Sequence, residues 1–285
     1  YTCYVTDNLN KLIGIMTVKT LLLSDENQKV EDLMEDNVIS VNTLDDQEAV
    51  ANLFTKYSLL AMPVVDKEER LVGIVTFDDA MDVLETEVTE DIEKMAAISP
   101  TDKPYLKTGV FETWRKRVPW LLLLMLSATF TSTILAHYES ILDAATISLA
   151  VFVPMLTGTG GNSGTQSSVA VIRALSLGEV EFSDTVRVIW KEIRVAVLCG
   201  ITLAAANFVK LILLDKLALM VALVVCLTLV LVVLVAKIIG CTLPMLADKA
   251  GLDPAVMASP FITTLVDAIA LVTYFKLATV LLHIA

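Results

Sequence analysis

Long apolar runs in the second part of the chain constrain its fold more than any other feature of the sequence. Each run is long enough for the roughly 20 residues that an α-helix needs to cross a membrane. Backbone polar groups must be satisfied internally in hydrocarbon, so segments of this kind are expected to be helical. We predict an all-α, polytopic membrane domain over residues 115–285. Its five transmembrane helices are expected at about 118–136, 144–175, 195–214, 217–246 and 258–283.

The charges are distributed as unevenly as the apolar residues. The first 117 residues contain 23 of the 33 acidic side chains but only 12 of the 21 basic ones, so nearly all of the net charge of −12 lies there. An acidic surface repels the phosphates of nucleic acid and attracts cations. The chain also has only two histidines, and its four cysteines form no C-x-x-C pair, which argues against a zinc site. We expect an acidic, soluble domain before the membrane domain.

The basic residues near the apolar runs predict the orientation in the membrane, because Lys and Arg accumulate in cytoplasmic loops. No Lys or Arg lies in the loop 137–143, which is therefore expected outside. This arrangement predicts a multi-pass protein of the cell (inner) membrane, with the acidic domain in the cytoplasm and the C-terminus outside. The basic residues expected on the inner side are Arg115, Lys116, Arg117, Arg173, Arg187, Lys191, Arg194, Lys237 and Lys249.

The acidic domain contains an internal repeat. Residues 5–17 and 64–76 share a pattern of strand, polar turn, second strand and helix, at a constant offset of 59 residues that follows from their numbering. Repetition at such a period indicates two copies of one supersecondary unit. The second copy is expected over residues 31–85, whereas residues 1–30 hold only the tail of the first.

The second copy resembles a cystathionine-beta-synthase (CBS) domain, an α/β regulatory module. The resemblance rests on the segments 62–66 and 71–79 and on a helix expected around 48–57. It implies an adenine nucleotide site, in which Thr76 and Asp79 match the ribose-binding Thr-x-x-Asp. Helix capping explains the same two residues equally well.

The end of the acidic domain concentrates carboxylates on one predicted helix. No Lys or Arg lies between Arg70 and Lys94 to compensate them. Side chains three or four positions apart share a helix face, so these like charges repel unless cations bind between them. Oxygen ligands of this kind suit Mg2+, which keeps part of its water shell; the alternative is a solvated acidic face. The acids are Asp78, Asp79, Asp82, Glu85, Glu87, Glu90, Asp91 and Glu93.

The second apolar run is interrupted by glycine and polar residues. Irregular or polar segments at membrane depth are tolerated only against protein or a water-filled cavity, so we expect this segment to line a pore. Close helix packing through small residues is the alternative, but it does not explain the amide side chains. The candidate pore-lining residues here are Gly160, Gly161, Asn162, Gly164 and Gln166.

The fifth run buries one carboxylate, Asp267, near the middle of an apolar helix. Insertion scales put the cost of such a charge at about 2.5–3.5 kcal/mol, and intramembrane acids usually serve function. In a two-fold dimer, two Asp267 side chains would face each other and form a site for a divalent cation. The alternative is a structural hydrogen bond to a Ser or Thr of a neighbouring helix.

Together these features resemble the MgtE family of magnesium channels over essentially the whole chain. The family pattern is carried by Pro-x-x-x-Gly-x-Gly-Gly-Asn-x-Gly-x-Gln from Pro154 and by Thr-x-x-Asp ending at Asp267. The resemblance implies a homodimer in membrane lipid with a Mg2+-selective pore on its axis, gated by intracellular Mg2+. A connecting helix over residues 86–114 would plug that pore.

The family's functional residues carry over to particular positions of this chain. The selectivity carboxylate falls on Asp267, and the acid of the cytoplasmic mouth falls on Asp253. Thr263 and Ser259 are expected to line the pore. Near its mouth Ser259 replaces an Asn that the family can carry, which leaves the selectivity among divalent cations open. The implied Mg2+-sensing acids are Asp79, Asp82, Glu87, Glu90 and Asp91.

Two other functions use parts of the same sequence. An ion-coupled secondary transporter could be built on the same helices, since glycine-rich broken helices also occur in transporters. A membrane scaffold that senses nucleotides would leave Asp267 unexplained. An enzyme is not expected, because an intramembrane aspartyl protease needs two carboxylates sharing a proton.

Overall fold

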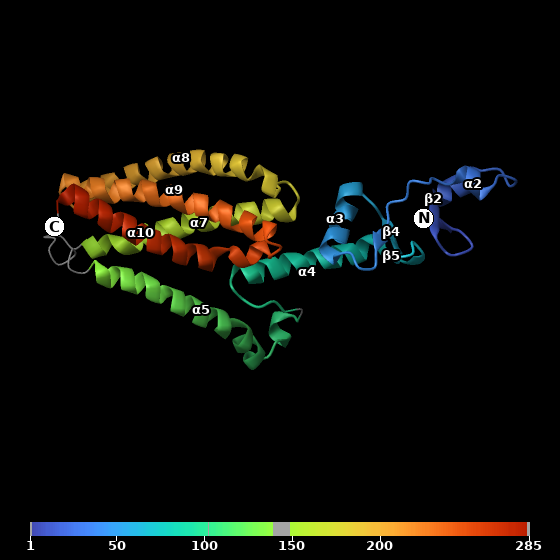
Figure 1. The fold of residues 1–285 in the computed structure, drawn as a ribbon, viewed down its shortest axis with the longest axis horizontal. Coiled ribbons are helices and arrows are strands. Elements are labelled where there is room, and N and C mark those ends of the chain that lie inside the picture. The colour runs from blue at the N-terminus through green and yellow to red at the C-terminus, as the bar shows by residue number, and fades with distance from the viewer. Residues whose placement is uncertain (1, 102, 139–148, 284–285) are drawn as a thin grey trace. The chain divides into compact units, whose positions relative to one another are not determined.

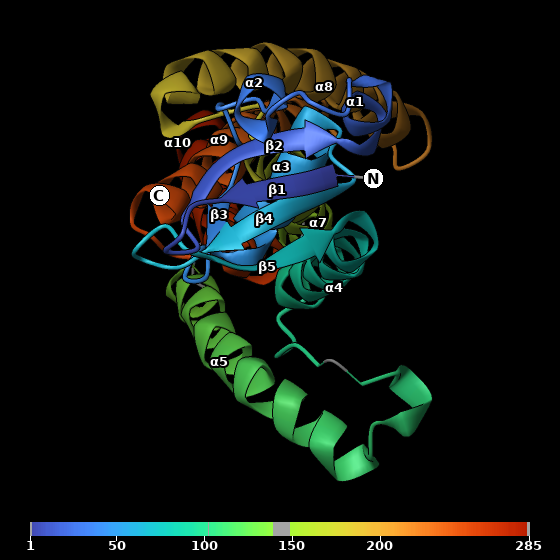
Figure 2. The same cartoon turned by 90° about the vertical axis from the view of Figure 1, so that its right-hand side faces the viewer.

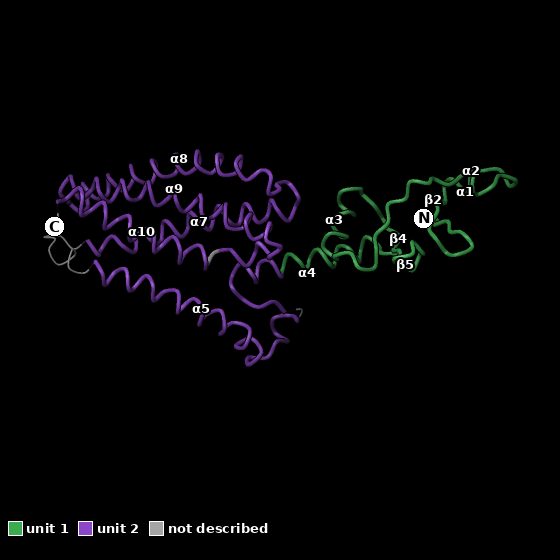
Figure 3. The backbone as a smooth tube through the Cα atoms, in the orientation of Figure 1, with its two compact units in different colours: residues 1–89 green, residues 90–285 purple. Residues whose placement is uncertain are grey.

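A computed structural model describes residues 2–101, 103–138 and 149–283. The chain forms two compact units, residues 1–89 and residues 90–285 (Figure 3). The first is an α/β unit and the second is helical, as the sequence predicts.

The first unit contains a two-stranded and a three-stranded sheet (Figure 2). In the three-stranded sheet, β4 is central, pairing in parallel with β3 and antiparallel with β5. The elements are β1 (Thr2–Thr6), β2 (Leu12–Thr17), α1 (Val18–Leu23), α2 (Val30–Leu33), β3 (Val41–Asn42), α3 (Gln47–Tyr57), β4 (Ala61–Val65), β5 (Leu71–Thr76) and α4 (Phe77–Met95), which continues into the second unit.

The backbone confirms the repeat of 59 residues. The β1–β2 hairpin has a register shift at Val5/Thr6, and the β4–β5 hairpin has one at Val64/Val65. Their turns place Asn10 and Glu69 at positive φ, 61° and 65°. The two hairpins also exchange backbone hydrogen bonds, from Leu12 N to the Glu69 oxygen and from Leu71 N to the Asn10 oxygen. The copies therefore share turn geometry as well as sequence.

The core of the first unit lies between the three-stranded sheet and the helices that follow its strands. Phe54 of α3 and Met62 of β4 are fully buried there, beside Ala51 and Ala80. Helix α3 is capped by Asp46, whose carboxylate accepts hydrogen bonds from the backbone nitrogens of residues 48 and 49. Such an N-cap stabilises a helix by about 1 kcal/mol.

The second unit is a helical bundle built around α9, which contacts α7, α8 and α10 (Figure 1). Helix α5 packs chiefly against α10. The elements after α4 are η1 (Tyr105–Lys107), α5 (Val110–His137), η2 (Leu149–Phe152), α7 (Val153–Ser176), η3 (Phe182–Asp184), α8 (Thr185–Leu213), α9 (Leu219–Lys249), η4 (Pro254–Met257) and α10 (Ser259–Leu282).

Four helical segments of the described chain are long and apolar enough to cross a membrane: 110–137, 182–213, 219–249 and 254–282. The chain is thus a multi-pass membrane protein. Helix α7 is not among the four, because its glycine and hydroxyl residues make it less apolar. The first residues of the predicted second span, 144–148, lie outside the described residues, and a total of five spans stays a prediction.

The segment predicted as one connecting helix, residues 86–114, is not a single helix. Helix α4 ends at Met95, and α5 begins only at Val110. Ala97 has a positive φ of 54°, and Ile98 N donates to the Glu93 oxygen in a Schellman-type ending. Pro100 and Pro104 follow in the connection; proline lacks a backbone N–H and commonly follows a helix end for that reason.

Helices α7 and α9 touch through their backbones. A Cβ atom on Gly240 would lie far inside van der Waals contact with the carbonyl oxygen of Gly164. Gly164 in turn faces Ile262 and the Ala236 oxygen. Only glycine at position 240 allows this approach.

We expect Gly240→Ala to destabilise the protein by about 1–3 kcal/mol, because the added methyl must push the two backbones apart. The melting temperature of the purified protein in detergent would measure the loss. Gly158→Ala is the matched control, since a Cβ on Gly158 of α7 meets no atom within 4 Å. Equal melting of the two variants would contradict the close approach.

Candidate functional site

The glycine-rich helix α7 has two different faces. Gly160, Gly161 and Gly164 are buried, and Cβ atoms there would overlap side chains of α9 and α10. Small residues at these positions let the helices approach closely, which is the alternative of helix packing given above for this segment. A direct pore-lining role for these three glycines stays a prediction.

The amide side chains of α7 lie on its other face. Asn162 and Gln166 are exposed and are one helical turn apart. In the described residues neither is covered by a neighbouring helix of the bundle. Both amides are therefore accessible for polar contacts outside the described bundle.

Asp267 is half-buried on α10 and makes no hydrogen bond or ion pair with any residue that the structure describes. Thr263, one turn earlier, faces Gly161, and its hydroxyl donates to the Pro260 oxygen at 3.0 Å. The Thr264 hydroxyl lies 3.2 Å from that of Ser127 on α5. These hydroxyls bind other groups, and none of the described residues forms the hydrogen bond to Asp267 that a structural role would use. The side chain of Ser259 lies outside it.

The last turn of α4 contacts the start of η4, within the second unit. The ammonium of Lys94 forms ion pairs with both Glu90 and Asp253. Asp253 also caps η4, accepting from Ala255 N at 2.8 Å. Next to this ion pair, Met95 packs on a small apolar cluster formed by Ile172, Ala255 and Ala258.

A second polar contact joins the same turn of α4 to the end of α7. The Ser176 hydroxyl donates to Asp91 at 3.3 Å. Burial alone would lower the pKa of Lys94, but its hydrogen bonds to Asp253 and Glu90 outweigh burial and raise that pKa. Lys94 therefore stays charged and carries the contact. This role of Lys94 was not predicted from the sequence, although a lone base after eight acids was the available signal.

The other predicted cation ligands are dispersed. Asp79 accepts from the backbone nitrogen of Thr76 at 3.2 Å and from the Thr76 hydroxyl, so this pair caps α4. Glu87 accepts from Gln47 at 2.8 Å, and Asp82 is exposed. Among the described residues of a single chain, no three His, Cys, Asp or Glu side chains gather closely enough to hold a metal ion.

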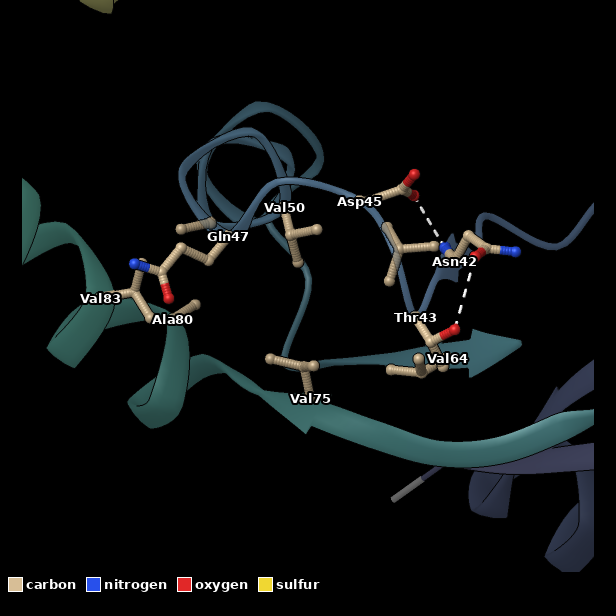
Figure 4. Close-up of a pocket in the computed structure, with 11 residues that line it drawn as sticks. Asn42, Thr43, Asp45, Gln47, Val50, Val64, Val75, Ala80 and Val83 are labelled. Atoms are coloured by element: carbon tan, nitrogen blue, oxygen red, sulfur yellow. Dashed lines mark hydrogen bonds between the residues drawn. The ribbon is translucent and has the colours of Figure 1, made fainter. Parts of the chain in front are cut away.

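A pocket of about 220 Å³ opens between α3, α4 and the three-stranded sheet (Figure 4). Its polar lining consists of Asn42, Thr43, Asp45 and Gln47, and Asp45 accepts from Asn42 N at 2.7 Å. Valines from the sheet and helices form the apolar side. Thr76, the predicted nucleotide contact, is not one of the residues that line this pocket.

A buried polar cluster was not predicted. Ser167 of α7, Glu192 of α8 and Lys237 of α9 meet inside the bundle. Lys237 was expected to flank the inner end of its span, but it is 5% exposed within α9. Lys237, a charge within the apolar run of α9, was the available signal, since such a charge needs a partner. Glu192 gave no such signal, because it lies beside Lys191 and near Arg194.

Comparisons with known proteins agree with both units. Residues 153–277 match the family model MgtE, divalent cation transporter, and residues 30–86 match the CBS domain model. The magnesium transporter MgtE of Thermus thermophilus is 42% identical over 99% of this chain and 62% of its own length. That of Bacillus subtilis is 38% identical over 98% of this chain and 61% of its own.

The chain thus spans about three fifths of the length of these curated relatives. A solved structure, described as the cytosolic domain of the Mg2+ channel MgtE in complex with ATP, is 43% identical over 29% of this chain and 34% of its own. Its TM-score is 0.29.

Proposed function

We propose that this chain, which belongs to the MgtE family by its membrane domain and carries a CBS domain before it, forms a Mg2+-selective ion channel. The observation that carries the proposal is Asp267, a half-buried intramembrane carboxylate with no partner among the described residues. A carboxylate left without a partner at this depth is suited to a cation that passes.

In a homodimer, the two Asp267 side chains would face each other across the axis. Two carboxylates attract a divalent cation and repel anions. Because Mg2+ dehydrates reluctantly, it would be held through its water shell. Thr263, Asn162 and Gln166 would offer further oxygen atoms to that shell, while the buried glycines let α7 approach α10.

We further propose that the acids of α4 sense Mg2+ on the cytoplasmic side. The contact of Lys94, in its last turn, with Asp253 would close the mouth, and Glu90 and Asp91 lie about one turn before Lys94. Bound cations would relieve the repulsion along the acidic helix and favour the closed state. The same contribution would come from the acids nearer the start of α4, Asp79, Asp82 and Glu87.

The pocket beside α3 is our candidate for an adenine nucleotide. Its valines offer an apolar surface for a base, and Asn42, Thr43 and Asp45 offer hydrogen bonds. Since Asp79 and Thr76 bind each other, the ribose would have to displace that pair or bind elsewhere.

Mg2+ flux into liposomes that contain the purified chain tests the channel. We expect flux down the Mg2+ gradient alone and suppression when Mg2+ on the cytoplasmic side of the chain is raised. Flux that required a gradient of a second ion would support the coupled transporter instead. Absence of any divalent flux from folded protein would reject both.

A further inference from the structure

Three polar side chains from three helices form a closed triangle inside the membrane domain. The Ser167 hydroxyl donates to Glu192 Oε2 at 2.6 Å. Lys237 Nζ donates to Ser167 Oγ at 3.1 Å and lies 3.5 Å from the same Glu192 oxygen. The side chains of Lys237 and Glu192 are only 6% and 13% exposed.

This triangle is placed where it controls the orientation of α7. Ser167 follows Gln166 directly, and Gly164 lies one turn before it. On α9, Lys237 follows Ala236, whose carbonyl oxygen faces Gly164. Rotation of α7 about its axis would break the bonds of Ser167 and would also turn Asn162 and Gln166 away from their present direction.

The glycine contacts restrain that rotation only through apolar packing. Val232 of α9 and Ile262 of α10 lie against Gly160 and Gly164, and such contacts carry no directional bond. Directional hydrogen bonds to a buried charge supply the missing restraint, since charge-assisted bonds are short and strongly oriented. Apolar side chains often replace buried ion pairs without loss of stability, so stability alone is weak evidence for the role of this pair.

We propose that Glu192 and Lys237 are positioning residues, which hold Ser167 and thereby aim the polar face of α7, Asn162 and Gln166, toward the permeating cation. This inference rests on the proposed channel function. Glu192 also compensates the charge of Lys237, which would otherwise oppose the entry of divalent cations. Selectivity then depends on residues that do not themselves contact the ion.

The first test compares Ser167→Ala with Ser167→Thr. Ser167→Ala leaves the ion pair but removes the hydroxyl that links it to α7, whereas Ser167→Thr keeps the hydroxyl. We expect Ser167→Ala to lower the ratio of Mg2+ to Na+ permeation about threefold or more, with a melting temperature near that of the wild type. Ser167→Thr should restore the ratio.

The double variant Glu192→Gln/Lys237→Met removes both charges together and avoids an unpaired buried ion. This variant should fold and conduct, but its ratio of Mg2+ to Na+ permeation should be lowered as in Ser167→Ala. Wild-type selectivity in both Ser167→Ala and the double variant would overturn the proposal. A loss of selectivity that is explained entirely by a lowered melting temperature would overturn it as well.

A second readout does not depend on flux. Gln166→Cys, in a background without the four native cysteines, reports the direction of α7 through its labelling rate with a water-soluble maleimide. We expect the double variant to slow this labelling severalfold, while unchanged labelling would overturn the positioning role. If the wild type conducts no Mg2+ but the labelling still changes, the channel proposal fails and the positioning of α7 stands.

Discussion

Asp267→Asn is expected to reduce Mg2+ flux at least about tenfold, because the neutral amide no longer balances the charge of the hydrated cation. Asn has nearly the shape of Asp, so packing around α10 should change little. In a dimer the substitution removes two charges at once, and a tenfold change corresponds to about 1.4 kcal/mol. Liposome flux at several Mg2+ concentrations, with Na+ flux in parallel, would measure the effect.

Asp215→Asn is the control for this experiment. Asp215 lies between α8 and α9 and forms an ion pair with Lys210 at 2.8 Å, away from α10 in sequence. Its substitution should leave the flux close to that of the wild type. Wild-type flux and selectivity in Asp267→Asn would show that the buried carboxylate is structural.

Lys94→Glu is expected to open the proposed mouth at low Mg2+, raising flux about tenfold. The substitution replaces two attractive pairs, with Glu90 and Asp253, by repulsion among three carboxylates. Partly exposed pairs each contribute about 1 kcal/mol or less, so the change from attraction to repulsion is of the order that a tenfold shift requires. Raised Mg2+ should restore closure, because a divalent cation can bridge the carboxylates.

Lys94→Arg keeps the positive charge and should remain closed at low Mg2+. Equal flux from Lys94→Glu, Lys94→Arg and the wild type would show that this contact does not govern opening.

The contact of Lys94 also predicts how closure depends on pH. The folded-state pKa of Lys94 is raised above its ordinary value of about 10.4, so its stabilising contribution is fully present below that ordinary pKa. The contribution is lost only as pH rises through the raised value. Deprotonation of Lys94 should therefore not open the proposed channel between about pH 6 and 9.

The sequence predicted the features that depend on periodicity and repetition. The repeated hairpins of residues 2–17 and 61–76 follow from the 59-residue offset, and the apolar runs after residue 180 became α8, α9 and α10. The break between α4 and α5 was not predicted, although Pro100 and Pro104 in this segment are typical of a helix end.

The candidate site was predictable in part. Asp267 was identifiable because one acid in an apolar helix stands out against its neighbours. The pairing of Lys94 with Asp253 and of Lys237 with Glu192 was not predictable, since the partners come from distant parts of the chain and sequence spacing does not reveal which surfaces meet. The division of α7 into a packed glycine face and an exposed amide face likewise required the positions of α9 and α10.

The backbone contact between Gly164 and Gly240 has a consequence for how the protein adapts to its lipid surroundings. Two helices that touch through main-chain atoms have no side chains at that point to repack, so α7 and α9 must tilt together. A bilayer thicker or thinner than the bundle is accommodated by tilting and by movement of loosely held helices. Helix α5, which packs chiefly against α10, is the element left to absorb that mismatch. Changes of lipid thickness should therefore act first on α5 and only weakly on the crossing of α7 and α9.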